Sequence, residues 1–122
     1  MTKDYIELGR ELDRGAKALG RQAPEIMGAM RNLASAAVKD GALDTKTKEL
    51  MALAISITSS CDSCIAYHTR NALRAGATKA EVVETIGVAL EMGGGPAIAY
   101  GVGALDAYEQ FMQAEFSSET ID

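Results

Sequence analysis

Both cysteines and the only histidine of this sequence lie close together, as Cys61, Cys64 and His68. On a helix, at about 100° per residue, these three side chains would fall within roughly 60° of one another. Two thiols in this spacing can close a disulfide, and an imidazole one turn from Cys64 can exchange protons with them. Ser59 or Ser60 is the expected N-cap, which places Cys61 at a helix N-terminus where the backbone dipole favours a thiolate. The pattern predicts thiol redox chemistry.

Neighbouring residues limit this prediction and leave alternatives open. Asp62 works against a thiolate, because a carboxylate in the same helical turn repels it, so we expect only moderate activation. Cysteine also packs as a small buried hydrophobe. A third interpretation is a metal site, in which Cys61, Cys64, His68 and Glu49 supply four ligands. Haem attachment through C-x-x-C-H is excluded, because that motif needs histidine at the position of Ile65.

Composition and charge narrow the class of protein. The 122 residues fit a single domain, residues 1–122, and 48% are apolar but only 5% aromatic, which suits closely packed helices. A net charge of −5 and a pI of about 4.9 argue against nucleic acid as a partner. No leader or long apolar run appears, so we expect a cytoplasmic protein without membrane contact. In that reducing compartment, paired cysteines are more often functional than structural.

The apolar periodicity predicts an all-α bundle of about six helices and no strand. The expected helices span about residues 4–19, 24–39, 45–58, 61–75, 79–92 and 96–116. The first is expected to be peripheral, whereas the third turns apolar on all sides and is expected to be buried on most faces. Asp44 or Thr45 should cap the third helix, and Thr78 with Glu81 forms a predicted capping box before the fifth.

Glycines mark the remaining boundaries and one close contact. Gly76 should stop the cysteine helix, and residues 93–95 should end the fifth. Gly101 and Gly103 lie inside the last helix, where each costs about 1 kcal/mol relative to Ala, so we expect another backbone to approach them closely. Residues 117–122 are expected to be frayed.

Three stretches of this chain resemble one known family. They are residues 49–54, Glu49-Leu-Met-Ala-Leu-Ala; the motif Cys61-x-x-Cys64-x-x-x-His68; and residues 72–78, Ala-Leu-Arg-Ala-Gly-Ala-Thr. Together they resemble the carboxymuconolactone decarboxylase superfamily, specifically its alkylhydroperoxidase D-like branch, over a core of about residues 41–95. The resemblance couples a glutamate twelve residues before the first cysteine to the cysteine pair and the following histidine.

The resemblance implies both an assembly and an activity. The protomer would be all-helical, associate into homo-trimers or homo-hexamers, and act as a peroxidase or disulfide reductase without a cofactor. By position, Cys64 would attack the peroxide, Cys61 would resolve the product, and Glu49 with His68 would relay protons. The substrate would be a peroxide or disulfide, with electrons from an external dithiol or a lipoyl-type donor. Ser63 stands where the best-studied relatives carry histidine, which predicts a shorter relay.

A second function class stays open within the same superfamily. In that class the chain is a lactone decarboxylase-like lyase or a ligand-binding protein, and its cysteines are incidental. We rank it lower because decarboxylases of the superfamily generally lack the cysteine pair. Tyr67 and Asn71 lie beside the predicted thiol face, and we expect them to serve in packing or capping.

Overall fold

The computed structural model describes the backbone of residues 2–121 and the side chains of residues 2–115. Within that range the chain forms six α-helices and no strand, as predicted. They are α1 (Tyr5–Gln22), α2 (Pro24–Val38), α3 (Thr45–Thr58), α4 (Asp62–Arg74), α5 (Lys79–Gly93) and α6 (Ala97–Ile121). No helix among the described residues is long and apolar enough to cross a membrane.

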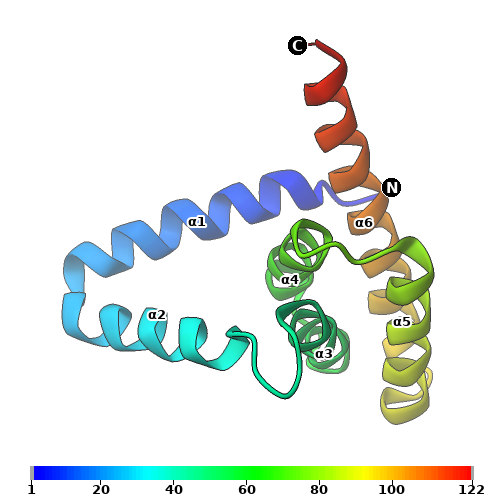
Figure 1. Cartoon of the computed structure of the whole chain (residues 1–122), viewed down its shortest axis with the longest axis horizontal. Helices are drawn as coiled ribbons and strands as arrows, with labels where there is room; N and C mark the ends of the chain where they lie inside the picture. Colours follow the sequence, from blue (N-terminus) through cyan, green and yellow to red (C-terminus); the bar gives the residue numbers. More distant parts are fainter. Residues whose placement is uncertain (1, 122) are drawn as a thin grey trace.

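The helices form a packed group and a projecting hairpin (Figure 1). Helices α3, α4, α5 and α6 pack around the core, while α1 and α2 run side by side away from it. The connection between α1 and α2 is short. Helix α2 can begin at Pro24, because a proline at the first position of a helix loses no intrahelical hydrogen bond. Helix α1 rests on α4 and α6, and α2 reaches back over α3. As predicted, α1 is peripheral and buries only Tyr5 and Gly9.

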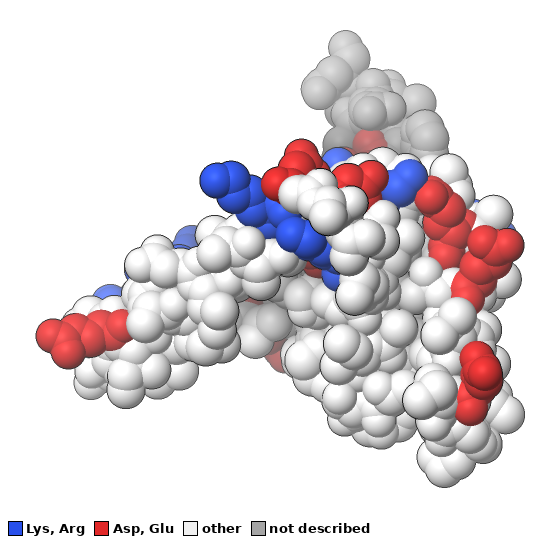
Figure 2. All heavy atoms as spheres, turned by 60° about the horizontal axis from the view of Figure 1, so that its bottom comes forward, with Lys and Arg blue, Asp and Glu red and all other residues white. Residues whose placement is uncertain are grey.

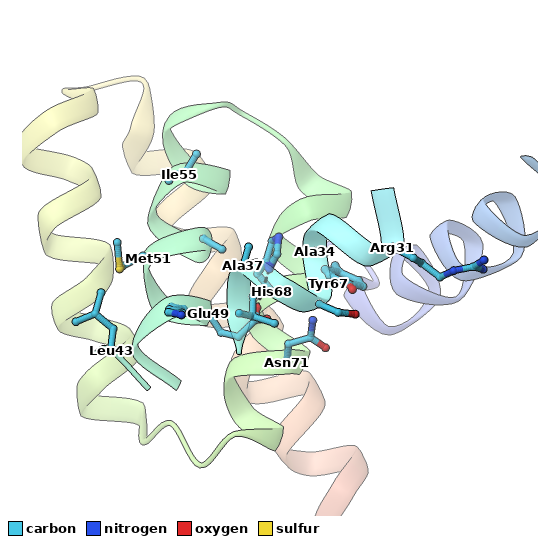
Figure 3. A pocket seen from close by; sticks show the side chains of 14 residues that line it. Arg31, Ala34, Ala37, Leu43, Glu49, Met51, Ile55, Tyr67, His68 and Asn71 are labelled. Atoms are coloured by element: carbon cyan, nitrogen blue, oxygen red, sulfur yellow. Dashed lines mark hydrogen bonds and ion pairs between the residues drawn. The ribbon is translucent and has the colours of Figure 1, made fainter. Parts of the chain in front are cut away.

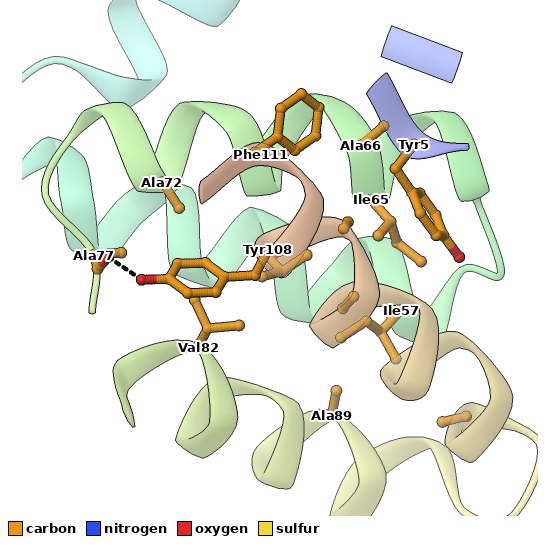
Figure 4. Packing of buried hydrophobic residues seen from close by; sticks show 14 residues of the cluster. Tyr5, Ile57, Ile65, Ala66, Ala72, Ala77, Val82, Ala89, Tyr108 and Phe111 are labelled. Carbon is orange, nitrogen blue, oxygen red and sulfur yellow. Dashed lines mark hydrogen bonds between the residues drawn. The ribbon is translucent and has the colours of Figure 1, made fainter. Parts of the chain in front are cut away.

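The core combines small, branched and aromatic apolar side chains, mainly from α3, α4, α5 and α6, with Tyr5 added from α1 (Figure 4). Its fully buried large members are Leu53 and Ile57 of α3, Ile65 of α4 and Val82 of α5. Ala104 and Ala107 of α6 are equally buried and let the helices approach closely. This core fixes α3 against α4, the two helices that carry the candidate site residues.

Side-chain caps explain where the central helices begin. The Asp44 carboxylate accepts a hydrogen bond from the Thr47 N–H at 2.8 Å, so Asp44 is the N-cap of α3. Thr78 and Glu81 form the predicted capping box of α5, with each side chain accepting from the other residue's backbone N–H. Gly76 has φ +95°, a conformation that glycine adopts at little cost, directly after the end of α4.

Three expectations are corrected by the structure. Helix α6 continues to Ile121 instead of ending near Phe116. In the tail predicted to be frayed, residues 117–122, the side chains and the whole of residue 122 lie outside the described residues. Gly101 and Gly103 do face close neighbours, but these are the side chains of Ile86 and Tyr5 rather than a backbone. Helix α3 is buried on fewer faces than predicted, because α2 covers it only in part. Its exposed residues include Met51 and Ile55, at 50% and 63%.

Candidate active site

The first cysteine caps its own helix. Cys61 precedes α4 with extended backbone angles, and its Sγ accepts a hydrogen bond from the Cys64 N–H at 3.2 Å. The predicted cap at Ser59 or Ser60 is therefore wrong. Both serines are used to reverse the chain after α3: Ser59 is the C-cap of α3, and Ser60 has φ +56°. The cysteine pair thus begins at the N-terminus of α4, where backbone N–H groups point at Cys61.

Cys61 and Cys64 are joined by a disulfide within the first turn of α4. Their Cα atoms lie 5.2 Å apart, and both residues are partly exposed. A helical turn brings the two side chains together, because residues three positions apart lie on the same face. The pair can therefore pass between a dithiol and a disulfide without a large change of the backbone.

His68 lies one turn further along α4 and is hydrogen-bonded to Glu49 of α3. The His68 Nδ1 and Glu49 Oε2 atoms are 2.8 Å apart. The Glu49 side chain is only 4% exposed, whereas the His68 ring is 25% exposed. When the proton is on Nδ1, the Nδ1–H group donates a hydrogen bond to the buried Glu49 carboxylate, which orients the ring. The other ring nitrogen, Nε2, is then free of a proton and can accept one. The structure thus brings together two of the predicted site residues.

A second set of contacts holds the Tyr67 ring, which lies next to His68. Tyr67 meets His68 edge-on, with ring centroids 4.9 Å apart, and the Arg70 guanidinium lies 5.4 Å from the Tyr67 centroid. Arg70 in turn donates to the Asp13 carboxylate of α1 at 2.9 Å, and this hydrogen bond holds the pKa of Asp13 below its usual value. The Asp13–Arg70 pair therefore ties α1 to the site helix and fixes the aromatic neighbour of His68.

A mostly apolar cavity of about 570 Å³ opens over the Glu49–His68 pair (Figure 3). Its walls come from α2 (Arg31, Ala34, Ala37), α3 (Glu49, Met51, Ile55) and α4 (Tyr67, His68, Asn71). This size lies within the range of small-molecule sites. The cysteines are not among its lining residues, whereas His68, one turn along α4 from Cys64, is one of them.

Sequence reasoning missed several residues around the site. Tyr67 and Asn71 were expected only in packing or capping, yet both line the cavity. Arg31, Ala34 and Ala37 reach it from α2, and no motif singles them out. The sequence offers one weak indication: these three residues are three positions apart, so they lie on the same face of α2. Among the described residues, no group of three or more His, Cys, Asp or Glu side chains is arranged to hold a metal ion.

The sequence pattern of the carboxymuconolactone decarboxylase family matches residues 24–107 of this chain. The chain belongs to this family. The matched range contains α2 to α5, the cysteine pair, the Glu49–His68 pair and every residue named above as a wall of the cavity.

Several relatives share nearly the whole chain. An uncharacterised protein of Cupriavidus necator is 38% identical over 89% of this chain and 96% of its own length. An uncharacterised protein of the cox locus of Paracoccus denitrificans is 36% identical, over 81% of this chain and 92% of its own.

Solved structures of family proteins have the same architecture. The apo form of a family member from Legionella pneumophila is 39% identical and superposes with a TM-score of 0.85, covering 88% of this chain and 96% of that one. A family member from Thermotoga maritima is 37% identical with a TM-score of 0.69, over 74% of this chain and 93% of that one. A possible involvement in antioxidative response is named for the Thermotoga protein. The all-α fold predicted from the sequence is therefore confirmed.

Proposed function

We propose that this family member belongs to the alkylhydroperoxidase D-like branch and is a thiol-dependent oxidoreductase that reduces peroxides or disulfides. One observation carries the proposal: a disulfide at the N-terminus of α4 lies one turn from His68, which is hydrogen-bonded to the buried Glu49. Such an arrangement combines a reversible redox pair with a proton acceptor on the same helix. The antioxidative response named for the Thermotoga relative is consistent with this chemistry.

The two cysteines have different roles in the proposal. In the reduced protein, His68 or Glu49 takes the proton of Cys64, whose thiolate attacks the O–O bond of a hydroperoxide. Cys64 becomes a sulfenic acid, and the departing alkoxide is protonated to an alcohol. The Cys61 thiol then condenses with the sulfenic acid, which forms the disulfide and releases water. The Cys64 N–H that reaches Cys61 Sγ stabilises negative charge there, as resolution requires.

Turnover needs an external electron donor. A dithiol or lipoyl-type donor attacks the disulfide, forms a mixed disulfide, and leaves as its own cyclic disulfide while both protein thiols are restored. No bound cofactor is needed in this cycle, because the electrons pass through the cysteine pair alone. A cytoplasmic location, where such donors are available, belongs to the same proposal.

Self-association is a further part of the proposal. The folded chain exposes 7724 Å², whereas a compact monomer of 12.8 kDa exposes about 6,300 Å². The excess is larger than the ~800 Å² that one partner buries in a standard interface. Helix α2 presents Ile26, Met30 and Leu33 at 69%, 55% and 62% exposure, and the face turned forward in Figure 2 is mostly uncharged. We expect a homo-trimer or homo-hexamer, and light scattering that gives a monomeric mass would refute it.

Turnover assays of cysteine variants test the proposed activity. Peroxide consumption driven by dihydrolipoamide is measured for the wild type and for the variants Cys61→Ser and Cys64→Ser. We expect both variants to lose catalytic turnover, with Cys64→Ser unable to consume even one equivalent of peroxide. Full turnover by Cys64→Ser would contradict the assignment of roles.

One observation favours a second candidate function. The cavity is lined by Glu49 and His68 but by neither cysteine, as a lyase or ligand-binding site would be if the disulfide were incidental. When a carboxylated lactone breaks its C–C bond and releases CO2, a Glu–His pair in an apolar cavity could donate a proton to the carbanion that is left, which is the chemistry of a decarboxylase-like member. Turnover of such a lactone by a variant with both cysteines changed to serine would favour this candidate over the redox one.

A further inference from the structure

The segment that precedes α1 is fixed against α6 by a single side chain. Gln110 accepts a hydrogen bond from the Tyr5 N–H and donates one to the Lys3 carbonyl oxygen, both at 2.8 Å. These contacts use only the backbone of residues 3 and 5. A change of the Lys3 side chain therefore leaves the Gln110 contacts in place.

From this position Lys3 reaches the start of the cysteine helix. Its Nζ donates a hydrogen bond to the Asp62 carboxylate and lies 5.9 Å from the centre of the Tyr100 ring. Asp62 is the first residue of α4 and directly follows Cys61, the N-cap. The carboxylate that opposes a thiolate at this helix N-terminus is thus paired with a cation from a distant part of the chain.

We propose that Lys3 is a positioning residue for the thiol chemistry, whose ammonium group offsets the Asp62 carboxylate and so stabilises the thiolate of Cys61. The reasoning is electrostatic. The helix N-terminus attracts the negative charge of a thiolate, and an unpaired carboxylate beside the thiol cancels much of this attraction. A carboxylate that is paired with a cation does not. The use of this effect in turnover rests on the proposed redox function. Lys3 carries no role in the motif from which the site was predicted.

Other charged and titratable groups surround the Lys3–Asp62 pair. Tyr5 and Tyr100 lie on the Lys3 side, Asp106 acts on Tyr5 from α6, and Glu49 and His68 lie on the cavity side. Burial raises the pKa of Tyr5, so its hydroxyl stays neutral around neutral pH. The hydrogen bond to Asp62 raises the pKa of Lys3, which stays a cation there. A change at Lys3 therefore removes one fixed charge.

The test measures how fast a single thiol reacts as the pH changes. Cys61 is left as the only cysteine by the change Cys64→Ser. Dithiothreitol breaks any disulfide between Cys61 and another molecule and leaves as its own cyclic disulfide. After desalting, iodoacetamide alkylates the Cys61 thiolate, forming a carbon–sulfur bond and releasing iodide. In this background Lys3→Gln is expected to alkylate roughly threefold more slowly at pH 7 and to shift the pH profile upward by about half a unit.

Matched variants separate a local charge effect from other causes. Lys3→Arg keeps the charge and should restore the original profile, and Asp62→Asn should shift the profile downward. Lys79→Gln is the control. Lys79, the first residue of α5, is about as exposed as Lys3 and forms an ion pair with Glu109 of α6. That variant should leave the profile unchanged. In 1 M salt, where the Debye length is about 3 Å, the difference between Lys3→Gln and its parent should shrink.

Three results would overturn the proposal. They are identical profiles for Lys3→Gln and its parent, failure of Lys3→Arg to restore the profile, and an equal shift in Lys79→Gln. The alkylation assay involves no peroxide and no turnover. Failure of the proposed redox function would therefore leave this test valid, and a failed test would leave the function of the cysteine pair standing.

Discussion

Helices α4 and α2 face the same cavity but are held in place very differently. Helix α4 buries Ile65, Ala66 and Ala72 completely, and its neighbour α3 does the same with Leu53 and Ile57. Helix α2 contributes no buried residue at all. Regions with little buried apolar contact open at lower free energy than the core. The groups that carry the proposed chemistry therefore lie on the rigid side of the cavity, and the opposite wall is the adjustable one.

The first prediction tests whether the core side carries the stability. Ile65→Ala removes a fully buried side chain between α4 and the core, and we expect a loss of about 2–5 kcal/mol in the free energy of unfolding. Leu33→Ala on α2 is the matched control and should cost less than about 1 kcal/mol in dilute, dissociated protein, because Leu33 is 62% exposed. Urea unfolding measures both. Equal losses would remove the distinction between the two helices.

The second prediction concerns the buried acid on the rigid side. Glu49→Gln keeps the size of the side chain but removes its ability to take a proton or to balance a charged His68. We expect kcat/KM for peroxide to fall by about 100-fold, the lower end of what general acid–base catalysis contributes. The exposed Glu84 of α5 provides the control Glu84→Gln, with unchanged kinetics. Wild-type rates in Glu49→Gln would contradict the proposed relay.

The third prediction fills the cavity from its adjustable wall. Ala34→Phe adds a ring to a residue of α2 that lines the cavity, so bulky organic hydroperoxides should react about tenfold less efficiently. Hydrogen peroxide needs little space, and its reduction should be nearly unchanged. Ala36→Phe, on a residue of α2 outside the lining, is the control. If Ala34→Phe slows both peroxides equally or neither, bulky substrates do not use this cavity.

The smallest effect is expected where α1 joins the site helix. The Arg70 hydrogen bond lowers the pKa of Asp13, so the stability it adds is present above the ordinary value of 3.8 and is lost as the pH falls through the lower folded-state pKa. Asp13→Asn should therefore cost about 1 kcal/mol or less at pH 7, because the Asp13 side chain is 47% exposed. Unfolding measured against pH should show this difference vanish in acid. A difference that persists at pH 2 would rule out the ion pair as its source.

The sequence predicted what local chemistry determines. Helix α3 begins where expected because Asp44 caps its N-terminus. The capping box of α5 also depends only on residues close to each other in the sequence. That Glu49 and His68 act together was implied only by the family resemblance, and their side chains are 2.8 Å apart in the structure. The cap of α4 was missed because a cysteine sulfur took the place of the usual hydroxyl.

Long-range and subunit-level features could not be read in the same way. Lys3 and Asp62 are 59 positions apart, and nothing in either neighbourhood indicates their pairing. The apolar residues of α2 recur at helical spacing, yet in the single chain Ile26, Met30 and Leu33 are exposed. A hydrophobic pattern indicates that a surface will be covered, but it does not indicate whether the same chain covers it.

The central claim is that Cys61 and Cys64 form a redox pair with distinct roles. The most direct measurement is the intact mass and free-thiol count of the reduced protein, before and after one equivalent of an organic hydroperoxide, with Cys61→Ser and Cys64→Ser treated alongside. We expect the wild type to lose two hydrogen atoms and both thiols, and only Cys61→Ser to yield a trapped sulfenic acid. Survival of both thiols in the wild type, or a sulfenic acid in Cys64→Ser, would contradict the claim.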